Sequence, residues 1–180
     1  EEEIISKKNI KFMEKINYSL QILEILKNIH EKGIIHCDIK PENFIFTMDG
    51  RQLILIDFGM AKTYINNDGS HKTQQNINQL IGSLRYCSLN SHNLCELSRR
   101  DDLISFVYLM MTLFVGNLPW ENMCGTREID KKELIKIRKK ISLTDDYNSI
   151  VMKKLNHIVS YLYEMEYETK PNYCLIEIHI

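Results

Sequence analysis

The segment 36–43, which reads HCDIKPEN, constrains the fold of this chain more than any other stretch. It places Asp38 five residues before Asn43, with Lys40 between them. At this spacing a carboxylate can accept the hydrogen bond of an attacking hydroxyl while a nearby amide oxygen holds a metal ion on a transferring phosphate. Lys40 can neutralise charge on that phosphate. The segment is therefore a candidate phosphoryl-transfer loop.

Taken alone, the same segment also fits a plain polar turn between a helix and a strand. A second motif, Asp57-Phe58-Gly59, changes this interpretation because it follows the first after a predicted hairpin. Its Asp would bind the magnesium ion that bridges the phosphates, and its Gly would let the backbone turn sharply. Both motifs occur in the right order, and a polar segment of activation-segment length follows them, which makes coincidence a poor explanation.

The length of 180 residues and the 44% of hydrophobic residues predict one domain over residues 1–180, and hydrophobic periodicity predicts that most of it is helical. Apolar residues at three- and four-residue spacing predict a largely buried helix over 9–31 that stops at Gly33. Two short apolar runs on either side of Asp49-Gly50 predict a hairpin over 44–56, which is the one strong strand signal. The polar segment 62–78 predicts a mobile surface loop. Further helices are expected over 103–115, 127–140 and 151–164.

The composition limits the partners that the chain can attract. The formal net charge of −1 gives no overall attraction to nucleic acid or to anionic membranes, and the apolar run 103–115 is too short to cross a bilayer. The five cysteines include no C-x-x-C pair, which favours free thiols in a reducing compartment, the cytoplasm or the nucleus. We expect a monomer that binds neither nucleic acid nor membranes.

Several later motifs, taken in order, resemble the signature of the casein kinase I family of serine/threonine protein kinases. They are Gly82-Ser83-Leu84-Arg85-Tyr86, Ser88-Leu89-Asn90, His92, Ser98-Arg99-Arg100-Asp101-Asp102-Leu103, Gly116-Asn117-Leu118-Pro119-Trp120 and Lys170-Pro171-Asn172-Tyr173. Most protein kinases carry Ala-Pro-Glu where this chain has Ser-Leu-Asn, which favours casein kinase I over the wider superfamily. The resemblance covers roughly the whole chain. It implies a protein kinase-like fold, namely a mainly α C-terminal lobe with a small β-hairpin.

The resemblance also implies ATP and Mg²⁺ as cofactors, and it gives the motif residues their roles. Asp38 is the expected catalytic base. Asn43 and Asp57 are the expected magnesium ligands, and with Lys40 they are expected to hold the nucleotide phosphates. Ser83 matches a family threonine whose hydroxyl bonds the catalytic Asp and helps to select serine or threonine substrates.

Two further residues are expected to support the site. Gly59 would provide the turn after Asp57, and the acidic residue that matches Asp102 in the family hydrogen-bonds the catalytic-loop backbone from a buried helix. Ser98 and Asp101 also form a capping box, which is sufficient to start that helix. Both interpretations can hold together.

The family's substrates are Ser or Thr residues in acidic or already phosphorylated protein segments. Such segments are held by an Arg after the Gly-Thr and by a Lys in a later loop. Arg85 matches the Arg, and Lys131, with Lys132 beside it, is the best match to the Lys. An arginine fork suits phosphate geometry, and a lysine adds a point charge. The alternative for Lys131 and Lys132 is a solvated, charged helix face.

A first departure from the family pattern concerns regulation by phosphorylation. Cys37 stands where many kinases have an Arg that pairs with an activation-loop phosphate, and a thiol cannot form that ion pair. Lys62 matches one lysine of the family's basic cluster, whereas Asn78 replaces another. We therefore predict that phosphorylation of Ser70 or Thr73 does not switch activity on.

A second departure concerns the ATP-covering lobe. The sequence has no Gly-rich loop before the first predicted helix and no Val-Ala-x-Lys strand. We therefore expect the N-terminal β lobe to be absent. Because that lobe positions the nucleotide, we expect the 180 residues alone to be nearly inactive.

Three functions compete at this point. The first is a protein serine/threonine kinase, and the second is a truncated, pseudokinase-like module that binds substrates or acts as a scaffold. The third is a small-molecule phosphotransferase with a kinase-like fold. Retention of Asp38, Asn43 and Asp57 favours the first over the second, and the peptide-docking segment around Ser83 and Arg85 argues against the third.

Overall fold

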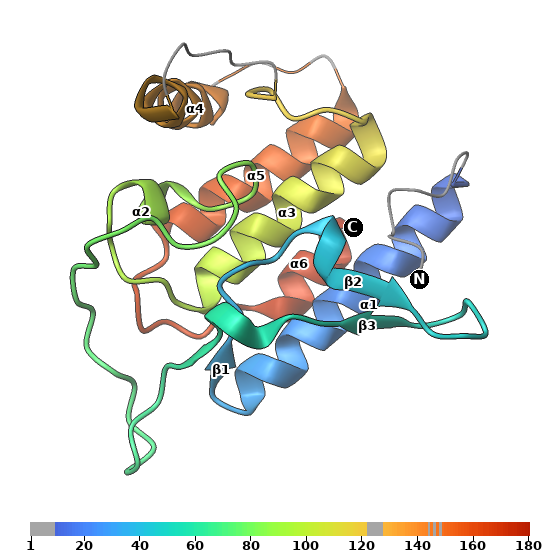
Figure 1. Ribbon diagram of the computed structural model, residues 1–180. Helices are drawn as coiled ribbons and strands as arrows, with labels where there is room; N and C mark the ends of the chain where they lie inside the picture. Colours follow the sequence, from blue (N-terminus) through green and yellow to red (C-terminus); the bar gives the residue numbers. More distant parts are fainter. Residues whose placement is uncertain (1–9, 122–127, 144, 146, 148) are drawn as a thin grey trace.

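The computed structural model describes residues 10–121, 128–143, 145, 147 and 149–180, and these form a mainly helical lobe with two small sheets (Figure 1). The helices are α1 (Phe12–Glu31), α2 (Leu89–His92), α3 (Arg99–Val115), α4 (Glu128–Ser142), α5 (Ile150–Glu164) and α6 (Tyr173–His179). The strands are β1 (Ile34–Ile35), β2 (Phe44–Phe46), β3 (Leu53–Leu55) and β4 (Lys62–Thr63). Short 3-10 turns cover Pro41–Asn43 and Phe58–Met60. The predicted fold class is confirmed.

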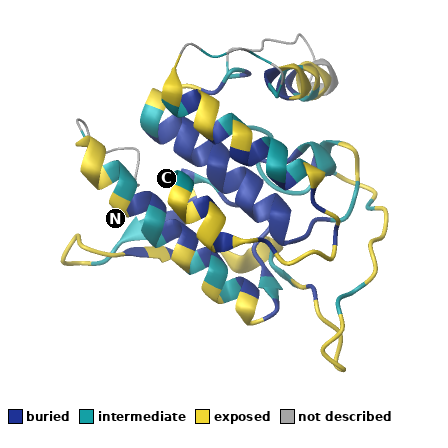
Figure 2. Cartoon of the chain, turned by 180° about the vertical axis from the view of Figure 1, so that it is seen from behind, coloured by how far each residue is buried: buried dark blue, intermediate teal, exposed yellow. Residues whose placement is uncertain are grey.

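Helix α3 forms the centre of the lobe. It packs against α1 and α5, and Figure 2 shows it as a continuous dark-blue element between more exposed helices. Leu103, Phe106 and Leu109 have no exposed surface, because a helix that is apolar on every side is stable only when it is covered all round. The helix starts where the sequence predicts a cap, since the Asp101 carboxylate accepts the backbone N–H of Ser98 at 2.8 Å.

Helix α1 covers one side of α3 and ends beside β1, which leads into the loop 36–43. Its apolar stripe buries Ile22 and Leu26 completely, as the periodicity predicts. The chain leaves the helix through Gly33, which has a φ of +78°. A Cβ at this position would lie 2.3 Å from the Ile65 side chain, so only glycine fits.

Of the two small sheets, one was predicted from the sequence and the other was not. The predicted hairpin is confirmed as the antiparallel pair β2–β3, in which Phe44 lies opposite Leu55. A second antiparallel pair, β1–β4, places Ile34 opposite Thr63 and Ile35 opposite Lys62. Strands of two residues are too short to show an alternating pattern, so this pair was not predicted. It joins the segment before the catalytic loop to the segment after Gly59.

Helix α4 crosses one end of the lobe and contacts α2 (Figure 1). The expected helices over 127–140 and 151–164 correspond to α4 and α5, and their observed bounds differ by a few residues at most. Two predicted helix starts, Asn9 and Arg127, lie outside the described residues, as does Cys124. Among the described helices, none is both long enough and apolar enough to cross a membrane.

Candidate active site

The loop between β1 and β2 brings three predicted residues together. Asp38 is buried, and the Lys40 ammonium lies 2.6 Å from its Oδ2. The Asn43 side-chain amide donates to the Asp38 backbone carbonyl at 2.7 Å. Because the amide nitrogen is used in this way, the amide oxygen of Asn43 is the atom left for a metal ion. The loop therefore fixes one carboxylate, one ammonium and one amide oxygen at a single point.

Lys40 stays protonated at neutral pH. The hydrogen bond to Asp38 raises the pKa of Lys40, and the negative charges of Asp38, Glu42 and Asp57 raise it further, against a smaller effect of burial. At neutral pH Lys40 therefore presents an ammonium to the Asp38 carboxylate.

Asp57 stands at the edge of the same loop. The backbone N–H of the preceding residue, Ile56, donates to the Asn43 carbonyl at 2.9 Å, which ties the end of β3 to the loop. Asp57 is exposed and adopts a left-handed φ of 60°. Its Oδ1 accepts the backbone N–H of Gly59 at 3.3 Å.

Gly59 lies in the turn after Asp57, but the turn does not depend on a left-handed conformation of the glycine. Gly59 lies in a 3-10 turn, and the left-handed residue is Asp57, because a short polar side chain can stabilise this conformation through a local hydrogen bond. The glycine has another use. A Cβ at Gly59 would lie 3.1 Å from Asp57 Oδ1 and would crowd the expected metal ligand.

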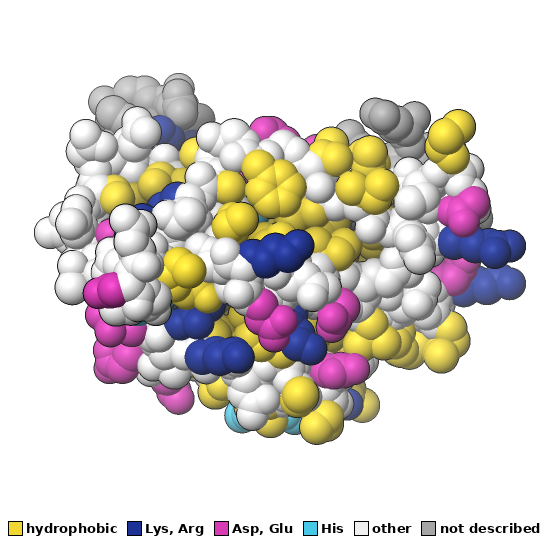
Figure 3. All heavy atoms as spheres, turned by 90° about the horizontal axis from the view of Figure 1, so that it is seen from below, with side chains coloured by type: hydrophobic (Ala, Val, Ile, Leu, Met, Phe, Trp, Pro, Cys, Tyr) yellow, Lys and Arg dark blue, Asp and Glu magenta, His cyan; other side chains and the backbone are white. Residues whose placement is uncertain are grey.

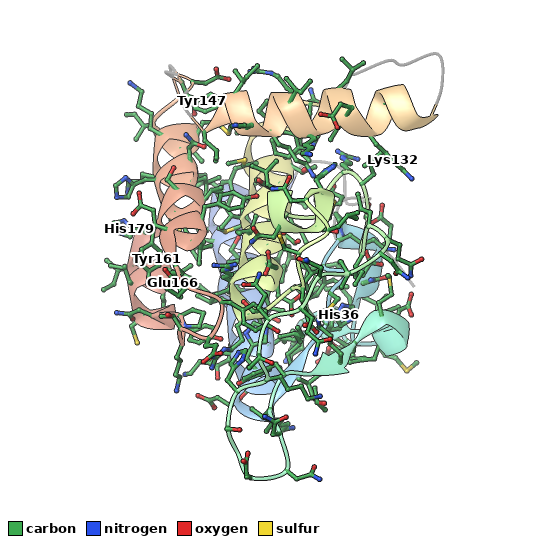
Figure 4. All side chains as sticks on the ribbon, turned by 90° about the vertical axis from the view of Figure 1, so that its left-hand side faces the viewer. His36, Lys132, Tyr147, Tyr161, Glu166 and His179 are labelled. Atoms are coloured by element: carbon green, nitrogen blue, oxygen red, sulfur yellow. The ribbon has the colours of Figure 1, made fainter. Side chains whose placement is uncertain are left out.

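His36 connects the two motifs. Its Nε2 donates to the Ile56 carbonyl at 3.1 Å, and its Nδ1 accepts the backbone N–H of Asp38 at 3.4 Å. Its ring also packs edge-on against Phe58, with 4.9 Å between the ring centres. In Figure 4 the labelled His36 lies inside the lobe, far from α4. The imidazole thus fixes the distance between the loop and the Asp57 motif.

Asp102 supports the loop from α3, as the resemblance implied. One carboxylate oxygen accepts the backbone N–H of His36 at 2.7 Å, and the other accepts that of Cys37 at 2.8 Å. Cys37 has a φ of 68°, which is unfavourable for a residue with a side chain. The buried carboxylate therefore holds a strained backbone directly before Asp38.

A second layer of this support was missed by the sequence analysis. His30 of α1 donates through Nε2 to Asp102 at 3.0 Å, and its Nδ1 lies 2.6 Å from the Tyr173 hydroxyl of α6. The Tyr64 hydroxyl donates to the His30 carbonyl at 2.5 Å. His30 lies among the apolar residues of α1, and only its partners, which are distant in sequence, distinguish it from a core residue.

Ser83 lies against the Asp38 carboxylate. Its backbone N–H donates to Asp38 Oδ1 at 2.9 Å. The expected contact used the hydroxyl, and that role stays a prediction. The neighbouring Gly82 has a φ of +87°, and a Cβ there would lie 2.7 Å from the Cys37 carbonyl. The chain can therefore approach Asp38 so closely only because residue 82 is glycine.

Arg85 and Lys131, the two predicted anion-site residues, line one surface hollow of about 250 Å³. Its wall consists of Ser83, Leu84, Arg85, Trp120, Glu121, Lys131 and Ile135. Lys132 is on α4 too, as Figure 4 shows, but it is not part of this wall. The Arg85 guanidinium already has an acidic partner, because its Nη2 lies 2.6 Å from Glu121 Oε1.

The segment 62–78 is held by a carboxylate that the sequence analysis did not identify. Lys62 pairs with Glu96 at 2.7 Å, and the second oxygen of Glu96 accepts the backbone N–H of Gln75 at 3.1 Å. Asn78 is exposed.

Burial raises the pKa of the Cys37 thiol well above its ordinary value, so this side chain stays neutral.

Lys139 is a second residue that was missed. It comes from α4, is fully buried, and donates to the carbonyls of Leu84 at 3.0 Å and Cys87 at 2.6 Å. A third neighbour, His92 Nε2, lies 3.4 Å away. The ammonium thus has two carbonyls and one imidazole as partners. The two carbonyls belong to residues that precede and follow Arg85 in the sequence. Periodicity cannot reveal this, because a Lys in a helix rich in Lys looks like a solvated residue.

Burial sets the ionisation of this cluster. It lowers the pKa of Lys139 to about 8, and only the nearby Cys87 opposes the shift. The rings of Tyr108 and Trp120 lie 5.5 Å and 5.2 Å from the ammonium and cover it. Burial and the positive charge of Lys139 lower the pKa of His92 to about 3, so the imidazole is neutral and can accept a hydrogen bond.

The donor set fits magnesium better than a transition metal. The described residues contain no cluster of three or more His, Cys, Asp or Glu side chains that could hold a metal ion. Mg²⁺ does not need such a cluster, because it is commonly held by one or two protein oxygens together with substrate phosphates. The amide oxygen of Asn43 and the carboxylate of Asp57 match this requirement.

The face of the molecule drawn in Figure 3 carries no single dominant charge. On the face drawn in Figure 3, Lys and Arg side chains lie next to Asp and Glu side chains, with apolar atoms between them. This agrees with a formal net charge of −1. Recognition of a charged partner must therefore rest on a few placed residues, such as those of the hollow.

Comparison with known proteins gives consistent results. Residues 1–176 match the protein kinase domain family. The chain is 37% identical over 161 residues to a "Probable casein kinase I homolog" of Encephalitozoon cuniculi, covering 85% of this chain and 48% of that protein. It is 31% identical over 166 residues to "Casein kinase I homolog 2" of Schizosaccharomyces pombe, covering 87% and 37%. A "Probable serine/threonine-protein kinase" of Dictyostelium discoideum is 28% identical over 165 residues, covering 90% and 32%. The chain thus spans half or less of the length of these relatives.

Proposed function

Because this chain belongs to the protein kinase family and is a casein kinase I-like member of it, we propose that the protein transfers the γ-phosphate of ATP to serine or threonine in acidic or already phosphorylated protein segments. The observation that carries the proposal is the loop geometry. The Lys40 ammonium lies 2.6 Å from the Asp38 carboxylate, and the Asn43 amide is fixed to the Asp38 backbone at 2.7 Å. A plain polar turn has no need of this arrangement.

Asp38 is the proposed base and orienting group for the substrate hydroxyl. Three neighbours set the position of its carboxylate and backbone, namely Lys40, the Asn43 amide and the Ser83 backbone N–H. A carboxylate held this way can accept the hydroxyl proton without reorganising. Lys40 keeps its charge because its pKa is raised, so it can contact an anionic oxygen of the phosphate.

Asn43 and Asp57 are the proposed magnesium ligands. When bound, Mg²⁺ would neutralise charge on the nucleotide phosphates. The protein supplies the two oxygens from adjoining segments, and the bond from Ile56 N–H to the Asn43 carbonyl keeps those segments in register. His36 contributes to the same register through its bond to the Ile56 carbonyl.

The preference for acidic substrates rests on the hollow beside Asp38. Arg85 and Lys131 both line it, and Ser83 joins it to the catalytic carboxylate. A negative group a few residues from the target hydroxyl could therefore reach a cation while the hydroxyl reaches Asp38. This supports peptide substrates over free small molecules.

An intracellular location is part of the proposal. The four described cysteines, Cys37, Cys87, Cys95 and Cys174, are free, and two of them are buried. Buried, unpaired thiols persist best where the environment is reducing.

The test is phosphoryl transfer to casein, and to an acidic peptide, by the full-length protein that contains this chain. We expect Asp38→Asn to lower the rate by about 100-fold or more, because the base is lost while the shape is kept. Asp68→Asn is the control, since Asp68 is an exposed carboxylate in segment 62–78. Equal rates for wild type and Asp38→Asn, with unchanged thermal unfolding, would overturn the proposed function.

A further inference from the structure

The anion hollow contains an acidic residue of the chain itself. Glu121 Oε1 lies 2.6 Å from Arg85 Nη2, and the two side chains are 25% and 37% exposed. Both residues line the hollow that is proposed to receive the negative group of a substrate. The arginine therefore meets a carboxylate before any substrate arrives.

Glu121 is held in this position by its own turn. Its backbone N–H donates to the Leu118 carbonyl at 3.0 Å, and its Oε2 accepts the Leu118 N–H at 3.0 Å. Pro119 occupies the second position of this four-residue turn, where its fixed φ is favourable. The two carboxylate oxygens thus have separate partners, one in the turn and one on Arg85.

Arg85 is tied to the same turn by its backbone. The Trp120 indole N–H donates to the Arg85 carbonyl at 2.8 Å, and Trp120 is almost fully buried. The guanidinium also lies over the Tyr86 ring, 5.1 Å from its centre. The backbone of Arg85 is therefore fixed, and its guanidinium has both Glu121 and the Tyr86 ring as neighbours. An arriving anion must share the guanidinium with Glu121 or displace it.

We propose that Glu121 is a specificity-determining residue that occupies Arg85 in place of the substrate's negative group and thereby raises the interaction strength that an anionic group needs in order to bind there. This rests on the proposed function. A phosphate carries close to two negative charges and three acceptor oxygens, whereas an Asp or Glu side chain carries one charge. Only the more highly charged group competes well with a carboxylate that is already in place. Lys131, which is exposed at the same hollow, is available to either ligand.

The test measures binding, so it does not depend on phosphoryl transfer. Three peptides share one sequence and carry phosphoserine, Asp or Ala at the position that reaches the hollow. Each is titrated into full-length wild-type protein and into Glu121→Gln, and the amide NMR signals of Ser83 and Arg85 report binding. Gln keeps the size of Glu and an oxygen for the Leu118 N–H, so the turn is preserved.

We expect Glu121→Gln to bind the Asp peptide about fivefold more tightly, in line with the strength of a partly exposed ion pair. The phosphoserine peptide should gain at least as much, because displacing Glu121 costs the same for either anion and a dianion meets stronger repulsion from its carboxylate, whereas the Ala peptide should bind as before. In an Arg85→Ala background, Glu121→Gln should give no gain. Asp145→Asn is the matched control, because Asp145 pairs with Arg138 at 2.8 Å, is 28% exposed and is not in the wall of the hollow. It should leave all three affinities unchanged.

Several outcomes would overturn the inference. They are no gain for the Asp peptide, an equal gain for the Ala peptide, a gain that persists without Arg85, or failure of every peptide to bind either protein. Because a gain of affinity is expected, a poorly folded variant cannot imitate the supporting result. Failure of the proposed function has a different signature, since it would abolish the effect of Asp38→Asn on transfer while leaving the peptide titrations readable.

Discussion

The Asp102 carboxylate accepts the backbone N–H of Cys37 at 2.8 Å, and Cys37 has a left-handed φ of 68°. Strain of this kind persists only where the surroundings impose it. Here a buried carboxylate of α3 imposes it on the residue directly before Asp38. The direction of the Asp38 side chain therefore depends on a residue 64 positions later in the chain.

The first prediction concerns this carboxylate. Asp102→Asn replaces one acceptor oxygen with an amide group that faces the donors of His36, Cys37 or His30. We expect a loss of unfolding free energy of about 1–3 kcal/mol, because a buried donor loses its partner. Urea unfolding of the full-length protein measures it, with the exposed Asp68→Asn as control. An unchanged midpoint would contradict the role of Asp102 as a buried support.

The second prediction concerns Gly82. A Cβ at this position would lie 2.7 Å from the Cys37 carbonyl, so Gly82→Ala must push the Ser83 segment away from Asp38. Gly69→Ala is a matched control, because Gly69 has a similar φ of +83° but nothing within 4 Å of the added Cβ.

We expect Gly69→Ala to cost about 1 kcal/mol for its backbone conformation alone. Gly82→Ala should lower the free energy of unfolding by more than this, and it should also lower the rate of phosphoryl transfer. Unfolding and transfer assays on both variants separate backbone strain from the close contact. Equal losses in the two variants would show that the approach to Cys37 does not matter.

The third prediction concerns the dependence of stability on pH. The pKa of Lys139 is lowered from 10.5 to about 8, so between these values the unfolded chain binds more protons at this residue than the folded chain. The contribution of Lys139 to the free energy of unfolding therefore rises as pH increases through this range, by up to about 1.4 kcal/mol per pH unit. Below pH 8 the cost of burying the charge is fully present.

Urea unfolding of wild type, Lys139→Met and the exposed Lys140→Met at pH 8 and pH 9.5 measures this contribution. The raised pKa of Cys87 acts in the opposite direction in this range and is itself coupled to Lys139, so all three proteins are compared in a Cys87→Ala background. We expect the difference between Lys139→Met and wild type to change with pH, while that of Lys140→Met stays constant. A constant difference for both would mean that Lys139 titrates normally.

The fourth prediction is that phosphorylation of Ser70 or Thr73 changes the transfer rate by less than about twofold. The reason is that the charges a phosphate would need are taken or missing. Lys62 pairs with Glu96, Cys37 is a neutral thiol, and the Ser70 hydroxyl already donates to the Asp68 carboxylate at 2.6 Å, which would repel a phosphate. Phosphatase treatment, with Ser70→Ala and Thr73→Ala as controls, provides the measurement. A large gain on phosphorylation would contradict this account.

Much of the fold and the central motif could be predicted because the signals are local. The helix around Leu103 is apolar on every side, and the hairpin at Asp49-Gly50 has its turn residues in place. Asp38 and Asn43 lie five positions apart, so one short loop brings them together, and their spacing could be read directly. In each case the residues that decide the structure are neighbours in the sequence.

What could not be predicted depends on contacts between distant segments. The sequence offers no reason why His30 should meet Asp102, why Lys139 should leave the solvent, or why Glu121 should face Arg85. The sharp turn after Asp57 was attributed to Gly59, whereas the left-handed residue there is Asp57, which adopts this conformation with the help of its own side chain. Tertiary packing decides these contacts and conformations, and the local sequence pattern does not predict that packing.

The short ladder between β1 and β4 has a further consequence. By pairing Ile35 with Lys62, it closes a ring of chain that contains Asp38, Asn43 and Asp57. A ring closed by so few backbone bonds can open as a small cooperative unit while the helices remain folded. Opening of this strand pair would remove one restraint on the three side chains, alongside those from Asp102 and His36, so the fraction of molecules competent for chemistry can fall before the lobe melts.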